Sequence, residues 1–127
     1  VMRVPEYPTA LWQYRAAPER TIDGDTLVVR IDLGLGVHLG RGNEGAHLRL
    51  LGVDTPERNE PGWSEARDFT MLWLAEANDR AWPLRIITEQ ADSFGRYLAW
   101  VWRVSDRRCL NSDLLAAGVA VERREKG

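Results

Sequence analysis

A chain of 127 residues is the size of one folded domain, and its single cysteine excludes an internal disulfide. The formal net charge of −2 excludes proteins that hold nucleic acid through a strongly basic surface, so any contact with nucleic acid must be local. No apolar run approaches the roughly 20 residues of a membrane span, and the N-terminus lacks a basic region followed by an apolar core. We expect a monomer with no membrane segment and no obligate protein partner, cytoplasmic unless a leader was removed.

The first half of the chain predicts strands separated by turns. Leu27 to Ile31 is rich in β-branched residues and follows an Asp23-Gly24 turn, which is typical of a strand, and His47 to Val53 predicts another. The connection between these strands is punctuated by glycines. We expect Val37 to Leu39 to pair briefly within it, and Gly40 to Gly45 to form a mobile hairpin tip.

The second half predicts two helices and two further strands. Ser64 to Arg80 repeats apolar residues at helical spacing, whereas Leu84 to Thr88 and Tyr97 to Val104 are typical of strands. The second of these strands is apolar on both faces, which predicts a central strand that is covered on both sides. Asn111 is a candidate N-cap of a short final helix, and Gly118 is its candidate left-handed C-cap.

Acidic turns follow two of the strands, and arginines accompany them. Asp25 comes directly after the Asp23-Gly24 turn, and Asp54 lies where the next strand breaks before a proline. Each turn alone has a structural explanation, because Asp-Gly is a common hairpin turn and an aspartate often caps a turn, and we assign Asp23 to that role. With Arg49 and Arg96, however, these carboxylates are the groups that metal-dependent phosphodiester hydrolysis needs.

Several motifs resemble the staphylococcal nuclease (thermonuclease) family in order and approximate spacing. They are Asp23-Gly24-Asp25-Thr26, Arg49 to Glu57, Asp92 to Arg96 with Leu98-Ala99, and Leu110-Asn111 with Gly118. Each motif is weak alone, whereas four in the right order make a chance match improbable. The resemblance implies a mainly β protein of the α+β class, a five-stranded OB-fold barrel with two helices. It places the domain at residues 11–122, after a lead-in at 1–10 and before a charged tail at 123–127, with the family's third helix absent or truncated.

The same resemblance implies roles for individual residues. The implied Ca²⁺ ligands are the carboxylates of Asp25 and Asp54 and the backbone carbonyl of Thr55. Glu57 is implied to orient or deprotonate the attacking water, and Arg49 and Arg96 to clamp the phosphate. The residue types support a hard cation independently, because the ligands are all oxygen, and one cysteine with two unpaired histidines argues against zinc.

Substrate contacts depart from the family's pattern. Ser93 and Phe94 occupy the turn where the family's best-known member carries a lysine and a tyrosine. Phe94 can stack on a base but cannot donate a hydrogen bond, and Trp63 is a second candidate for stacking. Arg85 and Arg103 lie on predicted strands and are expected to point into solvent.

These observations predict a Ca²⁺-dependent endonuclease or phosphodiesterase. The substrate is DNA, with RNA as a second candidate, preferably single-stranded or frayed, and the family resemblance implies products with 3′-phosphate ends. The alternative is a catalytically weak or inactive OB-fold module that binds nucleic acid or protein. The presence of both carboxylates and both arginines favours the enzyme.

Overall fold

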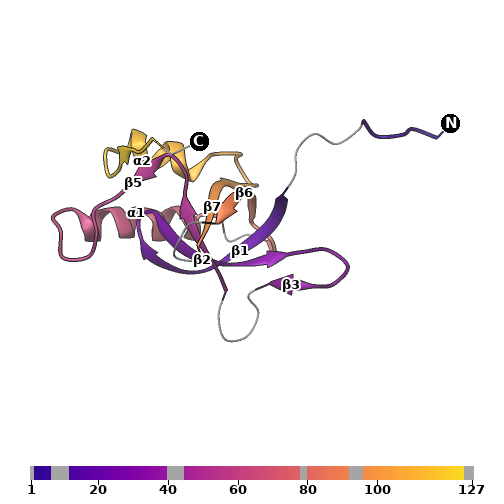
Figure 1. Cartoon of the computed structure of the whole chain (residues 1–127), viewed down its shortest axis with the longest axis horizontal. Helices are drawn as coiled ribbons and strands as arrows, with labels where there is room; N and C mark the ends of the chain where they lie inside the picture. Colours follow the sequence, from indigo (N-terminus) through magenta and orange to yellow (C-terminus); the bar gives the residue numbers. More distant parts are fainter. Residues whose placement is uncertain (1, 7–11, 40–44, 78–79, 92–95, 125–127) are drawn as a thin grey trace.

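The computed structural model describes residues 2–6, 12–39, 45–77, 80–91 and 96–124 (Figure 1). Within these residues the chain forms eight strands and two helices. The strands are β1 (Gln13–Asp23), β2 (Thr26–Asp32), β3 (His38–Leu39), β4 (Ala46–Leu50), β5 (Val53–Asp54), β6 (Leu84–Ala91), β7 (Tyr97–Arg103) and β8 (Val121–Glu122); the helices are α1 (Trp63–Ala75) and α2 (Leu110–Ala116). No helix in this part of the chain is long and apolar enough to cross a membrane.

Five strands close a barrel. Strand β1 pairs antiparallel with both β2 and β6, β6 pairs with β7, β7 pairs parallel with β4, and β4 returns to β2. Strand β3 pairs antiparallel with the end of β2 and is not part of the closed barrel. Strands β5 and β8 form a separate two-stranded antiparallel sheet. The predicted mainly β, five-stranded barrel with two helices is therefore confirmed, and the brief pairing expected near Val37 to Leu39 is found in β3. The expected mobile tip lies mostly outside the described residues.

Alternating strand residues fill the barrel, and the helices close it. On β2, for example, Leu27, Val29 and Ile31 are buried in the core, and each burial contributes roughly 1.5–3 kcal/mol. Trp73 and Leu74 enter the same core from α1. The parallel pairing of β4 with β7 brings the end of β4, and the turn that follows it, beside the start of α2.

Three predictions about strand and helix bounds and strand burial need correction. The strand expected from His47 to Val53 breaks at Gly52, whose φ of +77° reverses the chain, so that β5 leaves the barrel to pair with β8. Helix α1 ends at Ala75 rather than Arg80, with its last turn tightened by a bond from the Ala77 N–H to the Leu74 carbonyl. Strand β7 is central, but its Leu98, Trp100 and Trp102 face is only half-buried.

Asn111 is not the N-cap of α2. The cap is Cys109, and Asn111 lies inside the first turn with its side chain 1% exposed. Its amide accepts a bond from the Val101 N–H and donates to the carbonyls of Leu51 and Ala99. Gly118 does end the helix as predicted, with a φ of +76° and bonds from the N–H groups of residues 118 and 119 back to the last turn.

Arg103 was expected to be solvated, and that prediction is wrong. Its side chain is 5% exposed, and its guanidinium lies 4.4 Å from the centroid of the Trp73 ring. It donates to the Trp73 carbonyl at 3.1 Å and pairs with Glu76 and Asp106. Arg103 therefore supplies the positive charge at the end of α1, where the last turn itself carries no basic residue. Arg85 is exposed, as predicted.

Candidate active site

The two acidic turns meet at one end of the barrel. Asp25, between β1 and β2, is 5% exposed, and its Oδ2 accepts a bond of 2.9 Å from the Thr55 N–H. Its Oδ1 accepts a bond of 3.0 Å from the Thr26 hydroxyl. Asp54, at the end of β5, is more open, with 54% of its side chain exposed. One carboxylate is thus held rigidly by backbone and hydroxyl donors, while the other faces solvent.

Arg49 joins the two carboxylates. Its Nη2 lies 3.0 Å from Asp54 Oδ1 and 3.3 Å from Asp25 Oδ2. Its Nη1 donates to the carbonyls of Leu50 and Val53 at 2.7 and 2.8 Å. Although Arg49 is on the outward side of β4, the turn at Gly52 folds over it and leaves the side chain 5% exposed. The guanidinium that was predicted to clamp a phosphate is therefore held against the predicted metal ligands.

Helix α1 fixes the turn that carries Asp25. The Thr70 hydroxyl donates to the Gly24 carbonyl at 2.6 Å, and the Trp63 indole N–H donates to Asp23 Oδ1 at 2.7 Å. A Cβ at Gly24 would lie 2.8 Å from the Ala66 Cβ, so only glycine allows the helix to approach this closely. Sequence reasoning missed Thr70 and Ala66, because their positions on a helical stripe indicate only burial.

Trp63, predicted to stack on a base, also has arginines over its ring. The Arg67 guanidinium lies 4.5 Å from the ring centroid, and that of Arg58 lies 5.7 Å from it. Together with the bond to Asp23, these contacts assign the indole a structural role beside the site.

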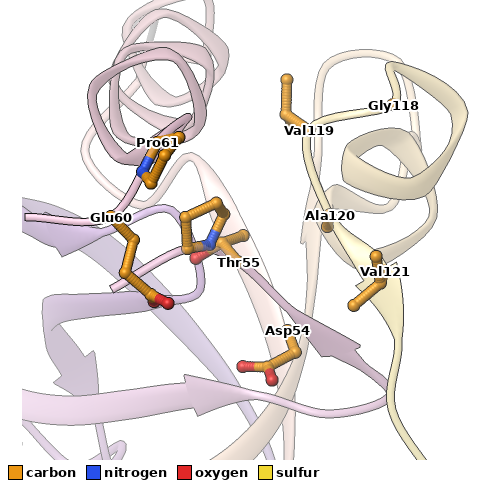
Figure 2. Close-up of a pocket in the computed structure, with 9 residues that line it drawn as sticks. Asp54, Thr55, Glu60, Pro61, Gly118, Val119, Ala120 and Val121 are labelled. Carbon is orange, nitrogen blue, oxygen red and sulfur yellow. The ribbon is translucent and has the colours of Figure 1, made fainter. Parts of the chain in front are cut away.

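A pocket of about 380 Å³ opens next to Asp54 and Thr55 (Figure 2). Its other wall is the segment from Gly118 to Val121, and the Glu60 carboxylate lies at its rim. Glu57, the predicted base, is exposed, and its N–H is bonded to the Glu60 carboxylate at 2.6 Å. The sequence shows several glutamates after Asp54, but only the structure places Glu60 in the pocket.

The remaining predicted contacts are only partly described. Arg96 is half-buried and directly precedes β7, which pairs with β4, so it approaches the barrel from the strand next to that of Arg49. Ser93 and Phe94 lie outside the described residues.

The donor set fits a hard cation. The Asp25 and Asp54 oxygens contact the same nitrogen, so they lie at most about 6.3 Å apart, the sum of the two distances. Ca²⁺ bonds of 2.3–2.6 Å bridge oxygens up to roughly 5 Å apart, so a small movement of the open Asp54 would let both bind one ion. Two carboxylates against one guanidinium also leave local negative charge. The described residues hold no cluster of three or more metal-ligating side chains, so carbonyls, water or substrate would complete such a site.

Comparison with known proteins agrees with this geometry. The sequence model of the family described as "Staphylococcal nuclease homologue" matches residues 47–126. A thermonuclease from Staphylococcus hyicus is 34% identical over 107 residues, 80% of this chain and 54% of the relative. A thermonuclease from Staphylococcus intermedius is 33% identical over 90 residues, 66% of this chain and 46% of the relative. "Probable endonuclease LCL3" from Yarrowia lipolytica is 30% identical over 91 residues, 65% of this chain and 38% of the relative.

The chain spans about half the length, or less, of these relatives. The family match covers more than half of the chain and includes Arg49, Asp54, Thr55 and Glu57 as well as α1, β6, β7 and α2. On the strength of that match and of the closed five-stranded barrel, this chain belongs to the staphylococcal nuclease family.

Proposed function

We propose that this chain is a Ca²⁺-dependent endonuclease that hydrolyses DNA, with RNA as a second substrate. The observation that supports the proposal most directly is the contact of one buried guanidinium, that of Arg49, with the carboxylates of both Asp25 and Asp54. Such a buried concentration of opposite charges is costly unless it has a use, and active sites are where it is commonly found. The similarity to two thermonucleases supports the reaction class.

In this proposal Asp25, Asp54 and the Thr55 carbonyl hold the cation. When bound, Ca²⁺ supplies positive charge that polarises the phosphate and favours ionisation of water. Asp25 needs no rearrangement, because Thr26 and Thr55 already orient its two oxygens. Arg49 contacts both carboxylates and presents positive charge beside the phosphate. Arg96, directly before β7, adds a second guanidinium.

A carboxylate beside the pocket would orient the attacking water. Glu57 is the residue that the family resemblance favours, whereas Glu60 is the one that lines the pocket. Replacing each by glutamine separates them, because both are exposed and neither change should unfold the protein. We expect Glu57→Gln to lower kcat by about 10²-fold, the scale of general acid-base catalysis, and Glu60→Gln to lower it less. The reverse order would move the role to Glu60.

Metal dependence is the main test of the proposal. Cleavage of single-stranded DNA is measured with Ca²⁺, with Mg²⁺ and with chelator. We expect activity with Ca²⁺, little with Mg²⁺, which demands octahedral geometry, and none with chelator. Asp25→Asn should abolish Ca²⁺-dependent cleavage, whereas Asp68→Asn, at an exposed aspartate of α1, should not. Absence of cleavage in every metal, with nucleic-acid binding retained, would favour the binding module instead.

We propose that the low net charge of the protein favours single-stranded over duplex DNA as the substrate. With a net charge of −2 the protein can neutralise few phosphates, so duplex DNA should be held weakly, with a shallow dependence on salt. Free bases can add stacking, worth about 1–3 kcal/mol per base, so single-stranded or frayed DNA should be cut faster. Matched single- and double-stranded oligonucleotides test this, and labelled products test the proposed 3′-phosphate ends.

A further inference from the structure

A row of side chains crosses the outside of the barrel, away from the candidate site. Strand registers place residues from β3, β2, β1, β6 and β7 opposite one another; in that order they are His38, Asp32, Arg15, Arg85 and Trp102. In β1, β2, β6 and β7 the preceding residue belongs to the core or packs against it, so this row faces outward. With strands about 4.8 Å apart, the row is roughly 19 Å long.

The exposed charge of this row is positive. The Arg15 side chain is 58% exposed, and Arg85 is exposed as well. The Asp32 side chain is 7% exposed, and the bond that it accepts from the Gly34 N–H, followed by the bond from Arg15, lowers the pKa of its carboxyl. Arg85 has no acidic partner among the residues that the structure describes. The face therefore differs in sign from the chain as a whole, whose net charge is −2.

Aromatic rings lie at both ends of this row. Arg30, two residues before Asp32 on the same face of β2, lies 5.0 Å from the centroid of the Trp82 ring. The His38 ring meets Trp82 edge-on, also at 5.0 Å. At the other end, Trp102 is half-buried, so part of its ring remains accessible. Guanidinium and indole groups thus share one outer face of the barrel, on which Arg15 and Arg85 are exposed and Arg30, Trp82 and Trp102 are half-buried.

This surface leads toward the candidate site. Trp100, two residues before Trp102, lies on the same face of β7 and contacts the turn at Gly52, where a Cβ would be 3.5 Å from its ring. Gly52 in turn lies two residues before Asp54. A strand of nucleic acid leaving the acidic turns could therefore continue over the tryptophans of β7 and onto the arginines of β6 and β1.

We infer that this arginine-tryptophan face, formed by Arg15, Arg30, Trp82, Arg85 and Trp102, binds single-stranded nucleic acid beyond the cleavage site. The inference rests on the proposed function and extends it to the path of the substrate. Guanidiniums attract the phosphates, and indole rings provide stacking surfaces that accept any base, which is how proteins bind single strands without sequence preference. The face would then lower KM for long strands while leaving kcat unchanged.

The test measures binding and cleavage separately. Binding of a fluorescent oligothymidylate is followed by anisotropy in chelator, where no metal-dependent cleavage occurs, across a range of salt concentrations. The variants are Arg85→Gln, which alters an exposed residue, and the Arg15→Gln/Arg85→Gln pair. Arg20→Gln is the matched control, because Arg20 is an exposed arginine of the same strand β1 that lies instead against α1. Circular dichroism verifies that each variant is folded.

We expect the double variant to bind the oligothymidylate on the order of ten-fold more weakly, with a salt slope reduced by about 1.4, or 0.7 for each lost phosphate contact. Arg85→Gln alone should show about half of the slope change, and Arg20→Gln none. Three outcomes would overturn the inference. An equal loss of affinity in Arg20→Gln would indicate an effect of general charge, and no change in Arg85→Gln would indicate that this residue makes no contact. Equally tight binding of polyglutamate would indicate that the ligand is an acidic polypeptide.

Cleavage distinguishes this inference from the proposed function. With Ca²⁺, the double variant should show a raised KM for long single strands and an unchanged kcat. Its rate on a dinucleotide, which is too short to reach the face, should match that of the unmodified protein. If the unmodified protein cleaves neither substrate, the proposed function fails; if it cleaves both and the double variant behaves identically, only the arginine-tryptophan face fails.

Discussion

Replacing Arg49 by methionine tests how the candidate site is built. The change removes the charge and four polar contacts, two with backbone carbonyls and two with carboxylates, while keeping a side chain of similar length. Breaking a buried charge pair costs about 3–5 kcal/mol when the partner remains charged and buried. Asp25 meets this condition, with 8% of its side chain exposed, whereas Asp54 is 54% exposed and adds about 1 kcal/mol at most.

We expect Arg49→Met to lower the free energy of unfolding by about 3 kcal/mol, the lower end of that range, because Thr26 and Thr55 still donate to Asp25. The measurement is urea unfolding in chelator at neutral pH. Most of the loss should come from the stranded Asp25 carboxylate, so the Asp25→Asn/Arg49→Met double variant should recover part of it. A coupling of about 1.5–3 kcal/mol is expected in this double-mutant cycle. A loss below about 1 kcal/mol, or strict additivity, would refute the reasoning.

Three further predictions concern polar side chains that stabilise the fold outside the candidate active site. Arg103→Met should lower the free energy of unfolding, measured by urea denaturation, by about 3 kcal/mol. It should leave kcat unchanged, because the guanidinium stabilises the end of α1 and takes no part in the reaction, and a large fall in kcat would contradict this. Asn111→Ala should lower the free energy of unfolding by about 2–4 kcal/mol, because it leaves buried backbone groups without their hydrogen-bond partner. A loss under about 1 kcal/mol would show that these groups find other partners. The pKa of Asp113 is lowered chiefly by its bond with Arg108, so the stability that its carboxylate contributes is fully present above the unfolded pKa of about 3.9 and is lost as the pH falls through the lower folded value. Asp113→Asn should therefore destabilise the protein at pH 7, and the difference should shrink as the pH falls below about 3.9; a difference that does not shrink would contradict this.

Local sequence was sufficient to predict the acidic turns and most strands. Asp25 follows an Asp-Gly turn and Asp54 ends a strand before proline, and both preferences act within a few residues. The alternation of Leu27, Val29 and Ile31 likewise requires only that one side of a strand be buried. The order of these segments, through the family resemblance, was enough to anticipate the closed barrel.

The tertiary structure alone decided what the polar side chains do. Arg49, Arg85 and Arg103 are all arginines on strands, yet one joins two carboxylates, one is exposed and one ends a helix. The difference depends on which segment covers each strand position. The turn that directly follows β4 covers Arg49. The end of α1, about thirty residues away in sequence, covers Arg103. Long polar side chains take partners from whatever the fold brings near, and those partners are separated from them by up to tens of residues, so short-range sequence patterns carry no record of the pairing.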